Sequence, residues 1–158
     1  MPEIKSGNVE FRHWEKILVH ITAEVKKFLK KPLISTLATI DELGAPRTRA
    51  IWHDWSSEQG LLLFTHTSST KWQHILRDPR VSLCVDDSET PYRSVTVDGH
   101  VEPVTNQSSL LFPAVLHMSR KYYGCIEGTK FAETYKDTDD SKVVLFRITI
   151  DRITVQGL

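Results

Sequence analysis

Three consecutive side chains between a predicted strand and a predicted helix suit the binding of an anion. Ser69, Thr70 and Lys71 follow the apolar run LLLF at 61–64 and precede a helical pattern at 72–77. The first turn of a helix presents free backbone N–H groups and the positive end of its dipole, and hydroxyl groups add further donors. A lysine ammonium supplies the full positive charge that a phosphate needs. The stretch therefore predicts the phosphate-binding corner of a domain that holds a phosphorylated cofactor.

The same residue types also have an ordinary structural use. Serine and threonine are favoured N-caps of any helix, and a lysine in the first turn of a surface helix is usually solvated. Taken alone, the stretch favours capping, so the anion site depends on support from the rest of the chain. His66 lies in the same turn, where contact with a cofactor and simple capping are both open.

Composition and charge limit the functional classes to which the protein can belong. A chain of 158 residues can build one domain with a proper core, and its 20 basic residues balance 20 acidic ones. A net charge of zero argues against electrostatic binding to nucleic acid or to a membrane surface. The first residues lack the apolar run of a secretory leader, and no segment reaches the length of a membrane span. We therefore expect a cytoplasmic protein.

Residues that could act as nucleophiles or metal ligands form no recognisable group. Cys84 and Cys125 are far apart and make no CxxC pair, and the seven histidines show no spacing typical of metal ligands. We expect neither a metal site nor a disulfide framework. The sequence indicates no Ser–His–Asp set, so it assigns no catalytic residue.

Apolar spacing and turn residues predict a mainly β domain, 1–158, with peripheral helices. Helices are expected at 8–31, ended by Pro32, at 69–77, at 106–123 with a break or first turn at Pro113, and at 129–135. Strands are expected at 33–40, 46–55, 61–67, 78–87, 92–104 and 142–150, the last with a tail to Val155. Gly44 allows a turn, and Gly99 indicates a bulge or a bend. Six strands joined by short turns favour an antiparallel closed or split barrel.

Three stretches resemble the pyridoxamine phosphate oxidase-like family of flavin-binding split barrels. They are LISTLATIDELGAPRTRAIW at 33–52, LLLFTHTSSTKWQHILRDPRVSL at 61–83 and YRSVTVDGHVEPV at 92–104, in the order that the family shows. The resemblance implies a six-stranded antiparallel split β-barrel with FMN as the cofactor. It also implies a homodimer in which the second subunit completes the cofactor pocket.

The resemblance also implies which residues contact the cofactor. The strand that starts at Arg47 would provide a phosphate-binding arginine and line the flavin ring, Phe64 and Thr65 would contact the ribityl-phosphate region, and Ser69, Thr70 and Lys71 would hold the phosphate. The full set on that strand is Arg47, Thr48, Arg49, Ala50, Ile51 and Trp52, with Ser94 added on a later strand.

Three departures separate this chain from the vitamin oxidases of the family. Thr70 stands where an arginine is common, Trp52 where those enzymes carry a substrate-binding lysine, and Ser94 where they carry a glutamine near the flavin. The segment at 142–158 also lacks their arginine- and histidine-bearing C-terminal pattern. The resemblance thus implies a relative that uses the same cofactor site, not a pyridoxine 5'-phosphate oxidase itself.

The tryptophans are candidates for the apolar surface that packs against a flavin ring. For Trp52, a place beside the flavin ring and a place in the protein core or dimer interface are equally favoured. For Trp55 and Trp72, packing in the core or at a dimer interface is the favoured interpretation. The basic and aromatic residues at 120–123 have two open interpretations. They lie near the entrance of the cofactor site, or they form the solvated end of a helix. A flavin carries the hydride itself, so no side-chain nucleophile is required.

The sequence leaves three functions open. The first is an FMN-dependent oxidoreductase that passes a hydride to or from a small organic substrate. The second is a reductase on the same fold that uses a deazaflavin coenzyme, whose longer anionic tail would meet basic residues: Lys26, Lys27, Lys30, Lys31, Arg120 and Lys121. The third is a protein that binds flavin or haem without catalysis.

Overall fold

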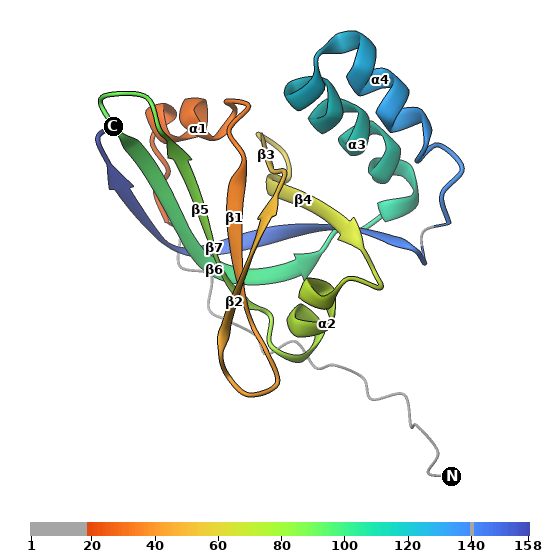
Figure 1. Cartoon of the computed structure of the whole chain (residues 1–158), viewed down its shortest axis with the longest axis horizontal. Coiled ribbons are helices and arrows are strands. Elements are labelled where there is room, and N and C mark those ends of the chain that lie inside the picture. The colour runs from red at the N-terminus through yellow and green to blue at the C-terminus, as the bar shows by residue number, and fades with distance from the viewer. Residues whose placement is uncertain (1–18, 140) are drawn as a thin grey trace.

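One antiparallel sheet, curled into a half barrel, carries the helices at its ends (Figure 1). The computed structural model describes residues 19–139 and 141–158, and within them the sheet has the strand order β2-β1-β5-β6-β7-β4-β3. The strands are β1 (Ser35–Ile40), β2 (Pro46–Ile51), β3 (Asp54–Ser56), β4 (Gly60–His66), β5 (Arg80–Asp87), β6 (Arg93–Pro103) and β7 (Val143–Gln156). The helices are α1 (Ala23–Leu29), α2 (Thr70–Arg77), α3 (Gln107–Tyr123) and α4 (Cys125–Glu133). The predicted mainly β fold class is confirmed.

The sheet has one strand more than the six predicted, because the expected strand at 46–55 is two strands. Ile51, at the end of β2, pairs with Ser35 of β1, whereas Asp54, at the start of β3, pairs with Leu62 of β4. β2 and β3 therefore form the two opposite edges of the sheet, and the chain crosses between them at residues 52–53. The crossing is fixed by buried His53, whose Nε2 lies 3.0 Å from the carbonyl oxygen of Leu29.

Two clusters of buried apolar side chains flank the same strands. Alternate residues of β4 point to opposite faces, so Leu61 and Leu63 belong to the cluster inside the barrel and Leu62 to the cluster under α3 and α4. Leu145 and Phe146 on β7 divide in the same way. β4 and the first half of β7, up to Ile148, are therefore covered on both faces, by the barrel interior on one side and by α3 and α4 on the other.

The predicted bulge at Gly99 is confirmed. The register between β6 and β7 shifts between Asp98 and Gly99. A Cβ at Gly99 would collide with the carbonyl oxygen of Thr149 on β7, so only glycine allows this close approach of the two strands. The predicted turn at Gly44 is also confirmed, with a positive φ of 78°.

The helices differ from the expectation at two points. The helix expected at 8–31 begins only at Ala23, where Thr22 is the N-cap, while residues 19–22 are not helical and 8–18 lie outside the described residues. Pro113 does not break the third helix, since α3 continues through it while Leu111 and Val115 hold the helix against the core. No helix in the described ranges has the length and apolarity needed to cross a membrane.

Candidate functional site

The turn between β4 and α2 is built as the sequence predicts, and Ser69 is the N-cap of α2. Its Oγ accepts a hydrogen bond from the backbone N–H of Trp72 at 3.3 Å and lies 3.2 Å from the hydroxyl oxygen of Thr65. Trp72 then packs its ring on Phe146 of the barrel core, with ring centroids 5.6 Å apart. The capping role of Ser69 is therefore real, and the core contact of Trp72 anchors the start of α2.

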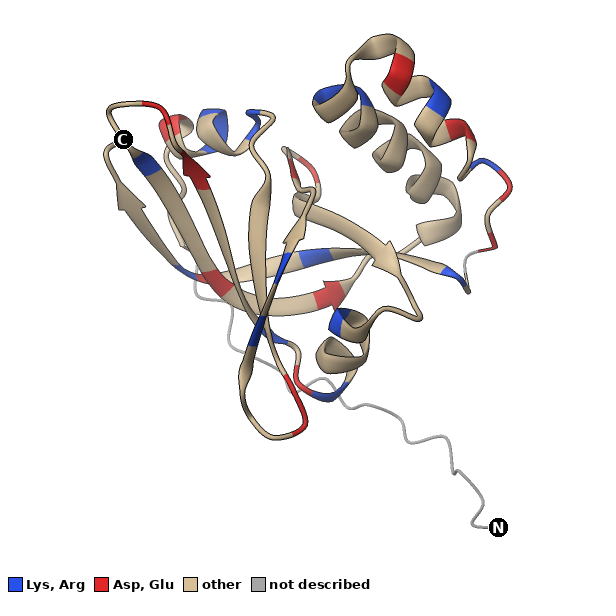
Figure 2. Cartoon of the chain, in the orientation of Figure 1, with Lys and Arg blue, Asp and Glu red and all other residues tan. Residues whose placement is uncertain are grey.

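Lys71, in the first turn of α2, lies close to Arg49 of β2. Its pKa is lowered by burial and by the positive charge of Arg49. Within residues 19–139 and 141–158, neither side chain forms an ion pair with an acidic residue, and the guanidinium of Arg49 donates only to the carbonyl oxygen of Thr48, at 2.9 Å. Figure 2 shows the basic segments of β2 and α2 among charges of both signs elsewhere on the fold. Two neighbouring cations without a counter-ion favour the binding of an anion.

Arg47, which is expected to meet the same phosphate as Lys71, forms an ion pair within its own β-hairpin. Its Nε donates to Asp41 at 2.8 Å, in the turn between β1 and β2. The backbone N–H of Ala45 and the Arg47 side chain hold the pKa of Asp41 below its usual value. The cation that acts on Lys71 is Arg49, two residues further along the same face of β2. Sequence alternation puts both arginines on that face and cannot tell which one Asp41 binds.

An apolar hollow of about 280 Å³ adjoins the same strand. Four of the predicted residues line it: Ala50, Ile51 and Trp52 from β2 and the residue that follows it, and Phe64 from β4. Ile34 and Phe131 complete the lining and were not predicted. Ile34 is 49% exposed although apolar, a feature that only a structure reveals, and Phe131 comes from α4, far along the chain.

Aromatic side chains of α3 and α4 form the wall behind Trp52. The indole of Trp52 stacks on Tyr122 with centroids 5.0 Å apart and an angle of 11°, and it meets Tyr123 and Phe131 at 4.8 and 5.3 Å. The hydroxyl group of Tyr122 donates to the carbonyl oxygen of Leu33 at 3.0 Å, and burial raises the pKa of Tyr122 to about 12. Part of the basic and aromatic group at 120–123 therefore lies beside the hollow.

The remaining predicted residues are divided between this region and another end of the sheet. Thr48 and Thr70 are exposed, Thr65 is buried beneath Ser69, and the exposed His66 has its ring 6.2 Å from that of Tyr135. Ser94 pairs with Asp86 at the end of β5 remote from α2 and lines a separate hollow of about 360 Å³. Within one subunit, the structure does not bring Ser94 together with Lys71.

Comparison with known proteins gives sequence relatives. Residues 21–157 match the family model described as Pyridoxamine 5'-phosphate oxidase. The curated pyridoxine/pyridoxamine 5'-phosphate oxidase of Burkholderia thailandensis is 32% identical over 81 residues, which are 51% of this chain and 37% of that protein. The matched region therefore spans little more than a third of the length of this relative.

Solved structures with the same fold extend over most of the chain. A conserved hypothetical protein from Mycobacterium tuberculosis has a TM-score of 0.70 and 28% identity, covering 87% of this chain and 84% of its own. A protein described as an F420 reductase has a TM-score of 0.63 and 24% identity, covering 82% and 94%. HutZ, described as a heme storage protein from Vibrio cholerae, has a TM-score of 0.65 and 20% identity, covering 85% and 94%. The last two likenesses support the fold alone.

Proposed function

Because the chain belongs to the pyridoxamine 5'-phosphate oxidase family, we propose that it is an FMN-dependent oxidoreductase that transfers a hydride to or from a small organic substrate. The observation that carries the proposal is the pair of Lys71 and Arg49, two adjacent cations with no acidic partner in the described chain. An apolar hollow lies further along the same strand as Arg49. A ligand with a phosphate at one end and a flat ring at the other satisfies both features.

Each part of the site has a definite role in this proposal. Lys71 and Arg49 hold the phosphate, and the hydroxyl group of Thr70 at the start of α2 adds a donor. Ala50, Trp52 and the neighbouring apolar residues exclude water from one side of the ring. FMN, when bound, supplies the hydride chemistry, so the protein contributes binding, orientation and a dry surface.

The direct test is an absorption spectrum of the purified protein followed by a titration with FMN. We expect flavin absorption bands, or uptake of added FMN that quenches the fluorescence of Trp52 beside the hollow. The variant Trp72→Phe serves as the matched control, because Trp72 packs on the core and its loss should leave most of the quenching intact. A colourless protein that takes up no FMN would refute the proposal.

We further propose that two copies of the chain form the functional unit. β2 is an edge strand with residues 46–50 exposed, and an uncovered edge is a surface for pairing with another chain. The apolar hollow that Ala50 and Ile51 of this edge strand line is open on one side, and a second copy seated on the edge would cover it. Sedimentation of the purified protein as a monomer at micromolar concentration would contradict the dimer.

A deazaflavin coenzyme is the second candidate cofactor, in line with the description of one similar structure as an F420 reductase. Of the six basic residues expected to meet its longer tail, Lys121 is buried and Lys31 is paired with Asp87 at 3.1 Å. Lys26, Lys27 and Lys30 remain exposed at α1 and its end. Competition between FMN and the deazaflavin coenzyme in one titration separates the two candidates by their dissociation constants.

A protein that binds flavin or haem without catalysis is the third candidate, in line with the description of HutZ. Anaerobic mixing of the flavin-loaded protein with a reduced nicotinamide nucleotide distinguishes it, since only the oxidoreductase is expected to bleach the flavin bands.

We place the protein in the cytoplasm, where the free thiols of Cys84 and Cys125 remain reduced.

A further inference from the structure

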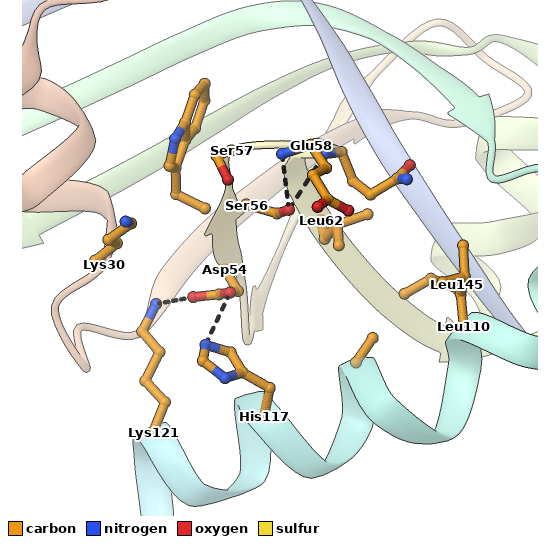
Figure 3. A pocket seen from close by; sticks show the side chains of 13 residues that line it. Lys30, Asp54, Ser56, Ser57, Glu58, Leu62, Leu110, His117, Lys121 and Leu145 are labelled. Atoms are coloured by element: carbon orange, nitrogen blue, oxygen red, sulfur yellow. Dashed lines mark hydrogen bonds and ion pairs between the residues drawn. The ribbon is translucent and has the colours of Figure 1, made fainter.

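A second hollow, of about 600 Å³, lies between α3 and the β3–β4 hairpin (Figure 3). Leu62, Leu110, Ala114 and Leu145 form an apolar wall, and polar side chains stand at the opposite end. It shares no lining residue with the hollow beside Trp52. Its volume falls in the range of about 300–1,000 Å³ that is typical of small-molecule sites.

Lys121 holds the polar end of this second hollow in place. Its buried ammonium donates to the carbonyl oxygens of Leu29 at 3.1 Å and His53 at 2.8 Å, and it pairs with Oδ1 of Asp54 at 3.4 Å. Burial lowers the pKa of Lys121, and the charge of Asp54 opposes that shift. Three acceptors use all three N–H groups, so Lys121 positions Asp54 and has no donor left for a ligand.

Asp54 in turn orients an imidazole at the mouth of the hollow. Its Oδ2 lies 3.2 Å from Nε2 of His117, and the two side chains are 9% and 70% exposed. Figure 3 shows Lys121 and His117 reaching Asp54 from the same helix. A carboxylate that accepts the Nε2–H of a neutral imidazole leaves Nδ1 as a proton acceptor. Among the residues that the structure describes, Nδ1 of His117 has no partner.

We propose that this hollow is a second small-molecule site, and that its ligand combines an apolar ring with a weakly acidic hydroxyl group of the phenol or enol class. The ring contacts the leucine wall while the hydroxyl group donates to Nδ1 of His117. On proton transfer the ligand O–H bond breaks, an N–H bond forms at Nδ1, and the electron pair stays on the ligand oxygen. Asp54 stabilises the imidazolium that results. Flavin binding is not required for any of these steps.

Charged groups from the neighbouring elements line the hollow together with His117. The buried side chains of Asp54 on β3 and Lys121 on α3 form an ion pair of opposite charges, and the exposed Lys30 after α1 and Glu58 between β3 and β4 add one further charge of each sign. Proton transfer creates an imidazolium and a ligand oxyanion side by side, so it adds no net charge to the hollow. A ligand that enters as a neutral weak acid leaves the net charge of the hollow unchanged, so it is favoured over a ligand with a permanent charge.

The test uses 4-nitrophenol as the probe, because its anion absorbs at a longer wavelength than its neutral form. The full chain is titrated below the solution pKa of the probe, and difference spectra against the same protein without probe report the bound anion. Wild-type protein should show the anion band. His117→Gln can still donate to Asp54 but has no basic nitrogen, so it should lose the band and bind about tenfold more weakly, the value of one charge-assisted hydrogen bond.

Three further variants locate the binding and control for folding. Ala114→Phe fills the hollow and should abolish probe binding, while the affinity for FMN in the same preparation stays unchanged. His20→Gln, at an exposed histidine outside both hollows, should match wild type. If circular dichroism shows that Ala114→Phe does not fold, Leu110→Phe in the same wall replaces it. No anion band in wild type, an undiminished band in His117→Gln, or normal binding in the filled variant would each overturn the proposal.

Discussion

Removing the charge of Lys71 should change the stability of the empty protein and its affinity for FMN in opposite directions. In the empty protein Lys71 lies beside Arg49 with no acidic neighbour in the described chain, so their repulsion opposes folding. Lys71→Gln removes that repulsion and should leave the free energy of unfolding unchanged or slightly higher. An ordinary surface salt-bridge lysine would show the reverse.

The same substitution removes one charge-assisted hydrogen bond to the phosphate of FMN. Such a bond contributes about 1.5–3 kcal/mol, so the dissociation constant for FMN should rise about ten- to a hundredfold. Arg49→Gln should cost a similar factor because it removes the other member of the pair. Arg47→Gln is the matched control: its side chain is bound to Asp41 at 2.8 Å, so its loss should change FMN affinity by much less.

Fluorescence titration with FMN and with riboflavin separates a phosphate contact from a general loss of structure. Riboflavin has the ring but no phosphate, so its affinity should be the same for wild type and Lys71→Gln. Urea unfolding of the empty variants supplies the stability values. If Lys71→Gln left FMN binding intact, or weakened riboflavin as much as FMN, the assignment of Lys71 to a phosphate site would be wrong.

Three further predictions concern stability. Burial, and to a smaller extent the charge of Lys121, lower the pKa of His53 from 6.5 to about 3. The imidazole is therefore protonated at a higher pH in the unfolded chain than in the folded protein. The free energy of unfolding should fall as the pH drops from 6.5 towards 3, by up to about 1.4 kcal/mol per pH unit. Urea titrations across that range should show a smaller slope in His53→Gln, and an equal slope would contradict the assignment. Gly99→Ala forces a Cβ against the carbonyl oxygen of Thr149 and should cost about 1–3 kcal/mol, measured as a lower melting temperature; an unchanged melting temperature would refute the close approach. Tyr122→Phe removes the hydroxyl oxygen that accepts a hydrogen bond from the backbone N–H of His53 at 3.2 Å, and it should lower the free energy of unfolding in urea by about 1–3 kcal/mol. An unchanged free energy of unfolding would contradict this hydrogen bond.

Local features of the fold could be predicted because their causes are local. The positive φ of Gly44, the cap at Ser69 and the strand at Gly60–His66 each depend on a few adjacent residues. The division of residues 46–55 into two strands could not be predicted in this way. Alternation of side chains continues across Trp52, and the break comes only from pairing with two different strands, at opposite edges of the sheet.

The candidate cofactor site was predicted in part for the same reason. The lysine turn and the strand beside the hollow could be recognised from residue types, but which arginine of β2 has an acidic partner depends on where Asp41 lies in the fold. The second hollow was missed altogether. Asp54 and His117 are distant along the chain, and neither residue alone has a pattern that indicates a site.

The amino-acid sequence by itself determined the strands outside residues 46–55, the turns, the hydroxyl-rich start of α2 and the family resemblance, since these follow from neighbouring residues and from short motifs. Only the tertiary structure decided which charges remain without a partner, as for Lys71 and Arg49, and which side chains from distant segments meet, as for Trp52 and Tyr122. The physical reason is that electrostatic pairing and burial depend on distance in space. The fold sets those distances, because it brings Arg49 of β2 near Lys71 of α2 and Trp52 after β2 against Tyr122 of α3.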